Sequence, residues 1–263
     1  MRHQNSEGGI AKSASRDRLR AAASHVRRCG LESFEVVALT HVPFLLLLVS
    51  VLSTFLKGRF ALLLAPIGIA VFLTLCLFAA LPMNVALSGY FIALAKGRHP
   101  RLLSIFCVFS DALQYRQAFL AMLIASAHSL LHIALCALPL LALPLVPGGY
   151  KLVLILLCAL AMVLMLLNRL LTYAFVGHFA WEYPYLTPRE ALRLSARITK
   201  GRRANLLRRL APYIALLLLT APSLGLLSLA VLPFYYTILA DCYIEYKQSG
   251  DVTLPSPKEY AHV

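Results

Sequence analysis

The stretch that decides the fold is KLVLILLCALAMVLMLLNRLLTYAFVGHFAW, residues 151–181. After its first residue it carries a single charged side chain, Arg169. A helix needs about 20 apolar residues to cross the hydrocarbon core of a bilayer, so this stretch is long enough to span one. The whole chain agrees, because 60% of its 263 residues are hydrophobic, only 14% are charged, and the mean hydropathy is +0.76. Since soluble domains carry roughly a quarter charged residues, we predict an integral membrane protein.

Five further apolar runs accompany this stretch, and short polar or proline-rich segments separate them. The loop PLLALPLVPGG (139–149) precedes it, and APSLG (221–225) divides the last run into two short spans. Pro82 is expected to interrupt the second run, after which the chain continues helically to a stop at Gly97. The predicted fold is an all-α bundle of six transmembrane helices, near 34–56, 60–81, 117–138, 151–181 and two within 210–246.

Two segments between the spans are predicted to be amphipathic helices at the membrane interface. LLSIFCVFSDAL (102–113) is amphipathic and too short to cross. TPRE (187–190) is typical of a capping box and opens a helix through Lys200 that is too polar to cross. The predicted organisation is a basic, partly disordered N-terminal tail (1–33), a six-span membrane domain (34–247) and a C-terminal tail (248–263).

The distribution of Lys and Arg predicts the orientation in the membrane. The net charge is +14, from 25 Lys and Arg against 11 Asp and Glu. With both termini in the cytoplasm, 21 of the basic residues lie on the cytoplasmic side and three on the other side. Cytoplasmic loops normally carry this excess, so N-in and C-in is the predicted topology. The repeated KGR at 57–59, 96–98 and 200–202 falls on both sides, so we interpret it as a turn with a charged flank.

Three segments resemble a known family. GYFIALAKGRHP, from Gly89 to Pro100, fits the pattern G-Y-x-x-x-L-A-x-G-x-x-P, and EALRLSARITKG, from Glu190 to Gly201, fits E-A-L-x-L-S-x-x-x-x-K-G. A closing Pro-aromatic segment runs from Pro233 to Tyr246. Over roughly residues 30–247 the chain resembles the bacterial integral membrane proteins catalogued as domain of unknown function 975. More distantly, it is similar to the membrane domain attached to some glycerophosphodiester phosphodiesterases, without their catalytic domain. The resemblance implies a multi-pass protein of a bacterial plasma membrane and carries no assigned activity.

The sequence contains few of the patterns that mark catalytic or metal-binding sites. The sequence contains no G-x-S-x-G, P-loop, G-x-G-x-x-G or H-E-x-x-H pattern, and its six cysteines form no C-x-x-C pair. We therefore expect no catalytic residues, no bound metal and no cofactor, and we interpret the cysteines as reduced structural residues.

A few polar residues inside the apolar runs are candidates for function, because polar groups in a membrane are costly and often retained for a purpose. His128 and His132 lie four apart on one helix face, which suits a shared metal or proton path; hydrogen bonding between helices is the interpretation we favour. Arg169 either extends to the head groups or forms an ion pair with Asp241 or Glu245.

The segment 187–209 is the richest in charge. Arg189, Arg193 and Arg197 recur at helical spacing, with Ala191, Leu194 and Ile198 on another face. Such a helix is predicted to rest at the interface with its cations on anionic lipid head groups; topogenic charge that only fixes orientation is the alternative. Nucleic acid is not expected, because aromatic residues do not alternate with these arginines. The predicted lipid contacts are Arg189, Arg193, Arg197, Lys200, Arg202 and Arg203.

Two functional classes fit these observations. The first is a non-enzymatic membrane protein that organises or senses the envelope, or that acts as an accessory subunit of another membrane protein. The second is a small transporter or permease component, for which matching Gly- or Pro-broken spans in two halves would be typical. Pro43 and the APSLG break match each other poorly, so the sequence favours the first class.

The topology can be tested by labelling single cysteines from outside the cell. A cysteine placed at Gly148 should react with a membrane-impermeant reagent, because the predicted loop 139–150 lies outside. A cysteine placed at Arg203 should not react. The reverse pattern of labelling would contradict the N-in, C-in arrangement.

Overall fold

The computed structural model describes residues 30, 32–47, 49, 61–145, 147–219 and 228–249, and within them it contains helices and turns but no strands. The chain is helical over 32–47. The elements that follow are α2 (Ala61–Leu75), the π-helix η1 (Cys76–Ala80), α3 (Leu81–Ala95), the 3₁₀ helix η2 (Leu102–Phe109), α4 (Ala112–Ala137), the 3₁₀ helix η3 (Leu138–Leu145), α5 (Gly148–Thr172), α6 (Val176–Glu182), α7 (Pro188–Thr199), α8 (Arg203–Leu219) and α9 (Ser228–Gln248).

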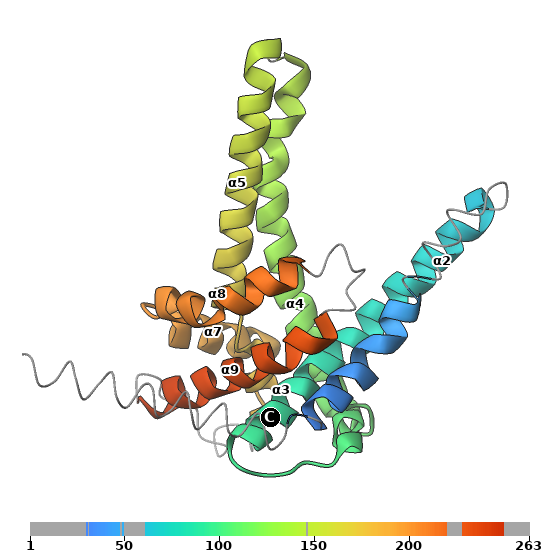
Figure 1. Ribbon diagram of the computed structural model, residues 1–263, viewed down its shortest axis with the longest axis vertical. Coiled ribbons are helices and arrows are strands. Elements are labelled where there is room, and N and C mark those ends of the chain that lie inside the picture. The colour runs from blue at the N-terminus through green and yellow to red at the C-terminus, as the bar shows by residue number, and fades with distance from the viewer. Residues whose placement is uncertain are drawn as a thin grey trace, which may run out of the picture.

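Two parts of the molecule project from a common body (Figure 1). The α4–α5 hairpin extends from one end, and α2 extends beside the N-terminal helix in a second direction. The remaining elements gather where these projections meet, and we call this body the base: α3, η2, α6, α7, α8 and α9. Figure 1 shows α8 and α9 lying across the base, transverse to the α4–α5 hairpin.

Three helical runs are long and apolar enough to cross a membrane: Pro66–Ala95, Ala112–Ala142 and Gly148–Glu182. The second, third and fourth predicted spans fall within or largely overlap them. Most of the apolar surface of α5 faces outward, with Leu152 65% and Leu156 60% exposed. Six of its less exposed residues form one seam at spacings of three and four, at 151, 154, 158, 162, 165 and 169, and α5 packs chiefly against α4. A single seam with apolar side chains on the other faces is the pattern expected of a helix bordered by lipid.

The structure gives less support to the first, fifth and sixth predicted spans. The N-terminal span is helical over 34–47 and at residue 49, and the rest of it lies outside the described residues. The predicted fifth and sixth spans correspond to α8 and α9, and within the described residues neither meets the length and hydropathy expected of a span. The six-span count therefore stays a prediction, while three candidate spans are observed in the described residues. The break at APSLG, the KGR turn at 57–59 and the 1–29 and 250–263 portions of the tails lie outside those residues.

Pro82 does not interrupt the second apolar run, contrary to expectation. Helix continues from η1 into α3, with Pro82 in the first turn of α3. Proline has no N–H, so the carbonyl four residues earlier, that of Phe78, loses its usual helical donor. The hydroxyl of Tyr115 on α4 donates to this carbonyl over 3.0 Å. A hydrogen bond from a neighbouring helix thus satisfies the group that the proline leaves unpaired.

The core of the base depends on close packing of α3 against α6. Gly89 on α3 lies directly beneath the indole ring of Trp181, and Gly177 on α6 lies against Ser88. Small residues allow two helix backbones to approach in this way. Around this contact two groups of buried side chains form, one including Tyr90 and Phe91 and the other including Phe175 and Phe179.

Replacement of Gly89 by alanine should therefore destabilise the base. A Cβ atom at this position would clash with the Trp181 ring, and overpacking of this kind costs about 1–3 kcal/mol of unfolding free energy. Gly149→Ala is the matched control, because no atom lies within 4 Å of the position its Cβ would take. Unfolding midpoints in detergent should fall for the first variant alone, and equal midpoints would contradict the packing described here.

Candidate functional site: a basic face and a shared glutamate

The helix α7 begins as the sequence predicts. Thr187 is its N-cap, and the full capping box is present. The Glu190 carboxylate accepts the Thr187 backbone N–H over 2.8 Å, while the Thr187 hydroxyl oxygen accepts the Glu190 N–H over 3.4 Å. The helix ends before Gly201, whose φ of 78° is a conformation that glycine adopts without strain.

One face of α7 is fixed against the protein. The apolar residues Ala191, Leu194 and Ile198 are buried in the base. Ser195 is fully buried; its hydroxyl donates to the Thr172 carbonyl over 2.8 Å and accepts the Phe175 N–H over 3.2 Å. These bonds attach α7 to the turn between α5 and α6. The apolar face that would insert into lipid in an ordinary interfacial helix is therefore occupied by protein.

The opposite face of α7 is basic and exposed. Residues 189, 193 and 197 lie on one stripe, and Lys200 follows at the end of the helix. Together they extend along about 16 Å of helix, at roughly 1.5 Å per residue. Within the described part of the chain, no hydrogen bond or ion pair engages any of the four cations. We call this set the basic face: Arg189, Arg193, Arg197 and Lys200.

Arg202 and Arg203, which the sequence groups with these cations, have protein partners. Arg202 donates to the Ser249 hydroxyl over 2.6 Å and to the Tyr246 carbonyl over 3.4 Å, and its guanidinium lies 5.0 Å from the centre of the Tyr246 ring. Arg203 donates to the Asn168 side-chain oxygen over 2.9 Å. These two arginines join α8 to α9 and to α5, and so differ in environment from the basic face.

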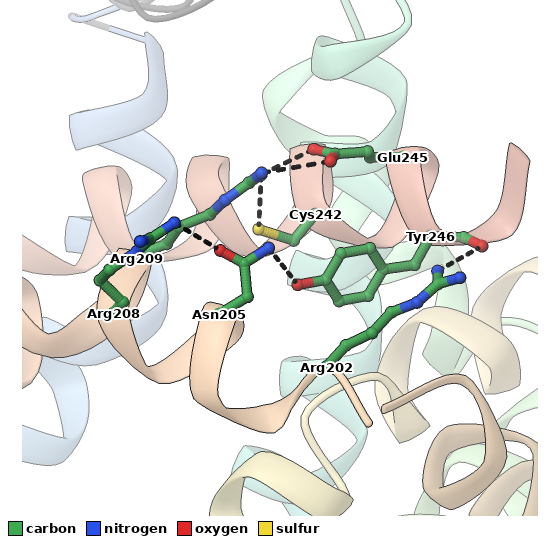
Figure 2. Close-up of polar contacts among 7 residues, drawn as sticks. All are labelled: Arg202, Asn205, Arg208, Arg209, Cys242, Glu245 and Tyr246. Atoms are coloured by element: carbon green, nitrogen blue, oxygen red, sulfur yellow. Dashed lines mark hydrogen bonds and ion pairs between the residues drawn. The ribbon is translucent and has the colours of Figure 1, made fainter. Parts of the chain in front are cut away.

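Figure 2 shows the polar contacts between α8 and α9, with Arg202 at one end of them. Arg209 makes two hydrogen bonds to Glu245, of 2.6 and 3.1 Å, and contacts the Cys242 thiol. The bond to this carboxylate raises the pKa of Arg209 above its usual value. Asn205 accepts a bond from Arg208 over 3.2 Å. Arg202 and Arg209 thus join α8 to α9, whereas the cations of α7 face outward.

A second charged group, which the sequence reasoning missed, lies where two candidate spans end. Glu182 closes α6, and its side chain is only 19% exposed. It accepts hydrogen bonds from Lys96 over 2.8 Å, from Lys247 over 2.7 Å and from the Tyr243 hydroxyl over 2.7 Å. Lys247 also lies 4.8 Å from the centre of the Tyr183 ring. We call Lys96, Glu182, Tyr243 and Lys247 the Glu182 cluster.

The signal for this cluster was present in the sequence. Glu182 is the first acidic residue after Asp111, at the end of a long apolar run, and a carboxylate in such a place requires a partner. The partners could not be identified, because Lys96 and Lys247 lie 86 and 65 residues away. Only the packing of α3, α6 and α9 brings them together.

The structure shows hydrogen bonds for three of the predicted intramembrane polar residues, His128, His132 and Arg169. The His128 ring and the Tyr173 hydroxyl are hydrogen-bonded over 2.9 Å, and Arg169 donates to the same hydroxyl over 3.5 Å. This contact joins α4 to the end of α5, and it confirms the predicted hydrogen bond between helices for His128. His132 bonds instead to the carbonyl of His128 in its own helix, over 2.6 Å.

The ion pair proposed for Arg169 is not observed in the described residues. Glu245 pairs with Arg209 instead, and no contact joins Arg169 to Asp241. His178 is buried between the rings of Phe175 and Tyr243, and neither of its ring nitrogens is hydrogen-bonded within the described part of the chain.

The chemistry available at these sites is electrostatic. Among the described residues, no group of three or more His, Cys, Asp or Glu side chains could hold a metal ion. The basic face can bind anionic groups, and the Glu182 cluster can hold helices together. Comparisons of the chain with protein-family models, with curated proteins and with solved structures find no match.

Replacement of Glu182 by glutamine tests whether the cluster stabilises the base. The change leaves Lys96 and Lys247 without the carboxylate that both contact, and because Glu182 is only 19% exposed the loss should exceed the roughly 1 kcal/mol typical of an exposed pair. Glu245→Gln is the control and should cost less, because the Glu245 side chain is 41% exposed against 19% for Glu182 and has one cationic partner among the described residues rather than two. Unfolding in detergent should show the larger loss for Glu182→Gln; similar losses would contradict a special role for this cluster.

Proposed function

We propose that the protein is a non-enzymatic, multi-pass membrane protein whose base lies at the cytoplasmic surface and holds anionic lipid head groups on the basic face. In this role it organises the membrane around it or serves as an accessory subunit of another membrane protein. The observation that carries the proposal is the set of four exposed cations along one side of α7, none of them engaged by the described protein.

The position of the basic face supports contact with a bilayer surface. The bond between Lys96 and Glu182 places the end of the Pro66–Ala95 run beside the end of the Gly148–Glu182 run. The helix α7 begins six residues after Glu182. Its cations are therefore close to the level at which two candidate spans leave the membrane, where each basic residue contributes about 1 kcal/mol to the attraction of an anionic leaflet.

The rigidity of α7 supports attraction by charge rather than insertion. Because its apolar face is buried in the base, α7 is not free to place those side chains among acyl chains. Binding of this kind should weaken as salt rises, since ions screen exposed charges beyond about 10 Å at 0.1 M. It should also accept different anionic head groups, because the face offers cations without an enclosing pocket.

The orientation of the chain in the membrane is part of the same proposal. In this arrangement both termini lie in the cytoplasm and the basic connections share one side. The resemblance to the bacterial family named above would place the protein in a plasma membrane.

A transporter or permease component is the second candidate. It is favoured by the polar series of Arg169, Tyr173 and His128, because polar side chains inside candidate spans often mark a path for ions or protons. Solute or proton flux in proteoliposomes that is abolished by His128→Ala would favour this candidate over the first.

The lipid proposal predicts a difference between two pairs of arginines in the full-length protein. Arg193→Gln with Arg197→Gln should lower affinity for anionic lipid about tenfold or more, at about 1 kcal/mol for each charge. Arg202→Gln with Arg203→Gln is the matched control and should lower it much less, because both side chains bond to protein. Native mass spectrometry of protein released from bilayers of mixed lipid measures the bound anionic lipid. Equal losses for the two pairs, or binding indifferent to salt, would contradict the proposal.

A further inference from the structure

The segment between α3 and α4 has a geometry that its sequence pattern did not reveal. η2 is a 3₁₀ helix, which has three residues per turn, so residues three apart lie directly above one another. Ile105 and Val108 form one such row and are fully buried. The next row is Leu103, Phe106 and Phe109, which are 72%, 39% and 41% exposed. The third row is polar or small: Ser104, Cys107 and Ser110.

The exposed row consists of three large apolar side chains in line, a feature that is unfavourable in water. The buried row already attaches η2 to the core beside α3 and α4. The exposed row is therefore not needed to fix the segment to the protein. A row of this kind marks a surface that contacts lipid or another apolar partner.

The exposed row is continuous with the outer surface of the candidate spans. The Phe109 ring lies 5.8 Å from Tyr115, and Tyr115 lies 6.2 Å from Phe119. Phe119 in turn stacks on Phe78, at 5.2 Å between ring centres. Phe78 and Phe119 belong to the runs Pro66–Ala95 and Ala112–Ala142. An unbroken series of aromatic rings thus leads from η2 onto surfaces that are apolar enough to border lipid.

The charges around η2 fit the boundary between acyl chains and head groups. Arg98, Arg101 and Arg116 are exposed on either side of the segment. The nearby carboxylate of Asp111 accepts the Leu113 N–H over 2.9 Å as the N-cap of α4. Apolar side chains flanked by exposed arginines are the composition of segments that lie within an anionic interface.

We propose that Leu103, Phe106 and Phe109 insert into the interfacial layer of the leaflet that borders the base. The segment η2 then contacts lipid along one row only, while its buried row holds the orientation. This contact depends on apolar insertion and is independent of the charge attraction proposed for α7.

Tryptophan scanning of the full-length protein in bilayers tests the proposal. Tryptophan is introduced singly at residues 103, 106 and 109, and the matched controls are Cys107→Trp and Ser110→Trp on the exposed third row. The probes are lipid brominated on its acyl chains, which quenches fluorescence from within the bilayer, and aqueous iodide. The chain has one native tryptophan, Trp181, whose own quenching is measured in the unsubstituted protein and subtracted.

The expected result is a period of three along the segment. Brominated lipid should quench the residue 103, 106 and 109 variants several-fold more than the two controls, and iodide should show the reverse order. Quenching of the row by iodide would mean that it faces water, and protection from both probes would mean that protein covers it; either result overturns the proposal. The pattern should persist in bilayers of neutral lipid and after Arg193→Gln with Arg197→Gln, so it can succeed or fail separately from the role of α7.

Discussion

The arrangement of the base depends on one carboxylate. Glu182 lies at the end of the longest apolar run, and it receives donors from the end of α3 and from two positions on α9. A mostly buried charge of this kind is tolerated only when it is paired and hydrogen-bonded. Because Glu182 and its partners come from three helices, pairing fixes the ends of α3, α6 and α9 at a common level. The positions of α7, which follows α6, and of η2, which follows α3, are set by the same contact.

Much of the local structure could be predicted from the sequence, because it depends on neighbouring residues. The capping box at Thr187, the stop at Gly97 and the apolar runs that become α4 and α5 follow from spacing and composition within a few residues. The expectation for Pro82 is wrong because the outcome there depends on a residue that is distant in the sequence. Its effect on the helix is cancelled by Tyr115, a residue 33 positions later whose proximity no local pattern indicates.

The candidate sites also combine features that local sequence predicts with features that depend on distant contacts. The stripe of cations on α7 was visible as a repeat of four residues, but the sequence could not separate it from Arg202 and Arg203, since partners on α5 and α9 distinguish them. The exposed row of η2 was hidden because a period of three emerges only when the segment is known to be a 3₁₀ helix. Both surfaces adjoin the ends of the candidate spans. One offers fixed charge and the other apolar side chains, so they would meet different depths of the same leaflet.

The α4–α5 hairpin also bears on how the protein is made. Between Arg116 and Lys151 the chain carries no residue with a formal charge, and this interval includes α4 from Gln117 onward and the tip of the hairpin. Moving a charged side chain through the centre of a bilayer costs several kcal/mol, whereas this tip presents prolines, glycines and leucines. In the proposed topology, the two helices would enter the membrane during synthesis as a paired unit, with Lys151 as the one formal charge carried across. Insertion of this hairpin would then meet only a small energetic barrier at the loop that crosses the membrane.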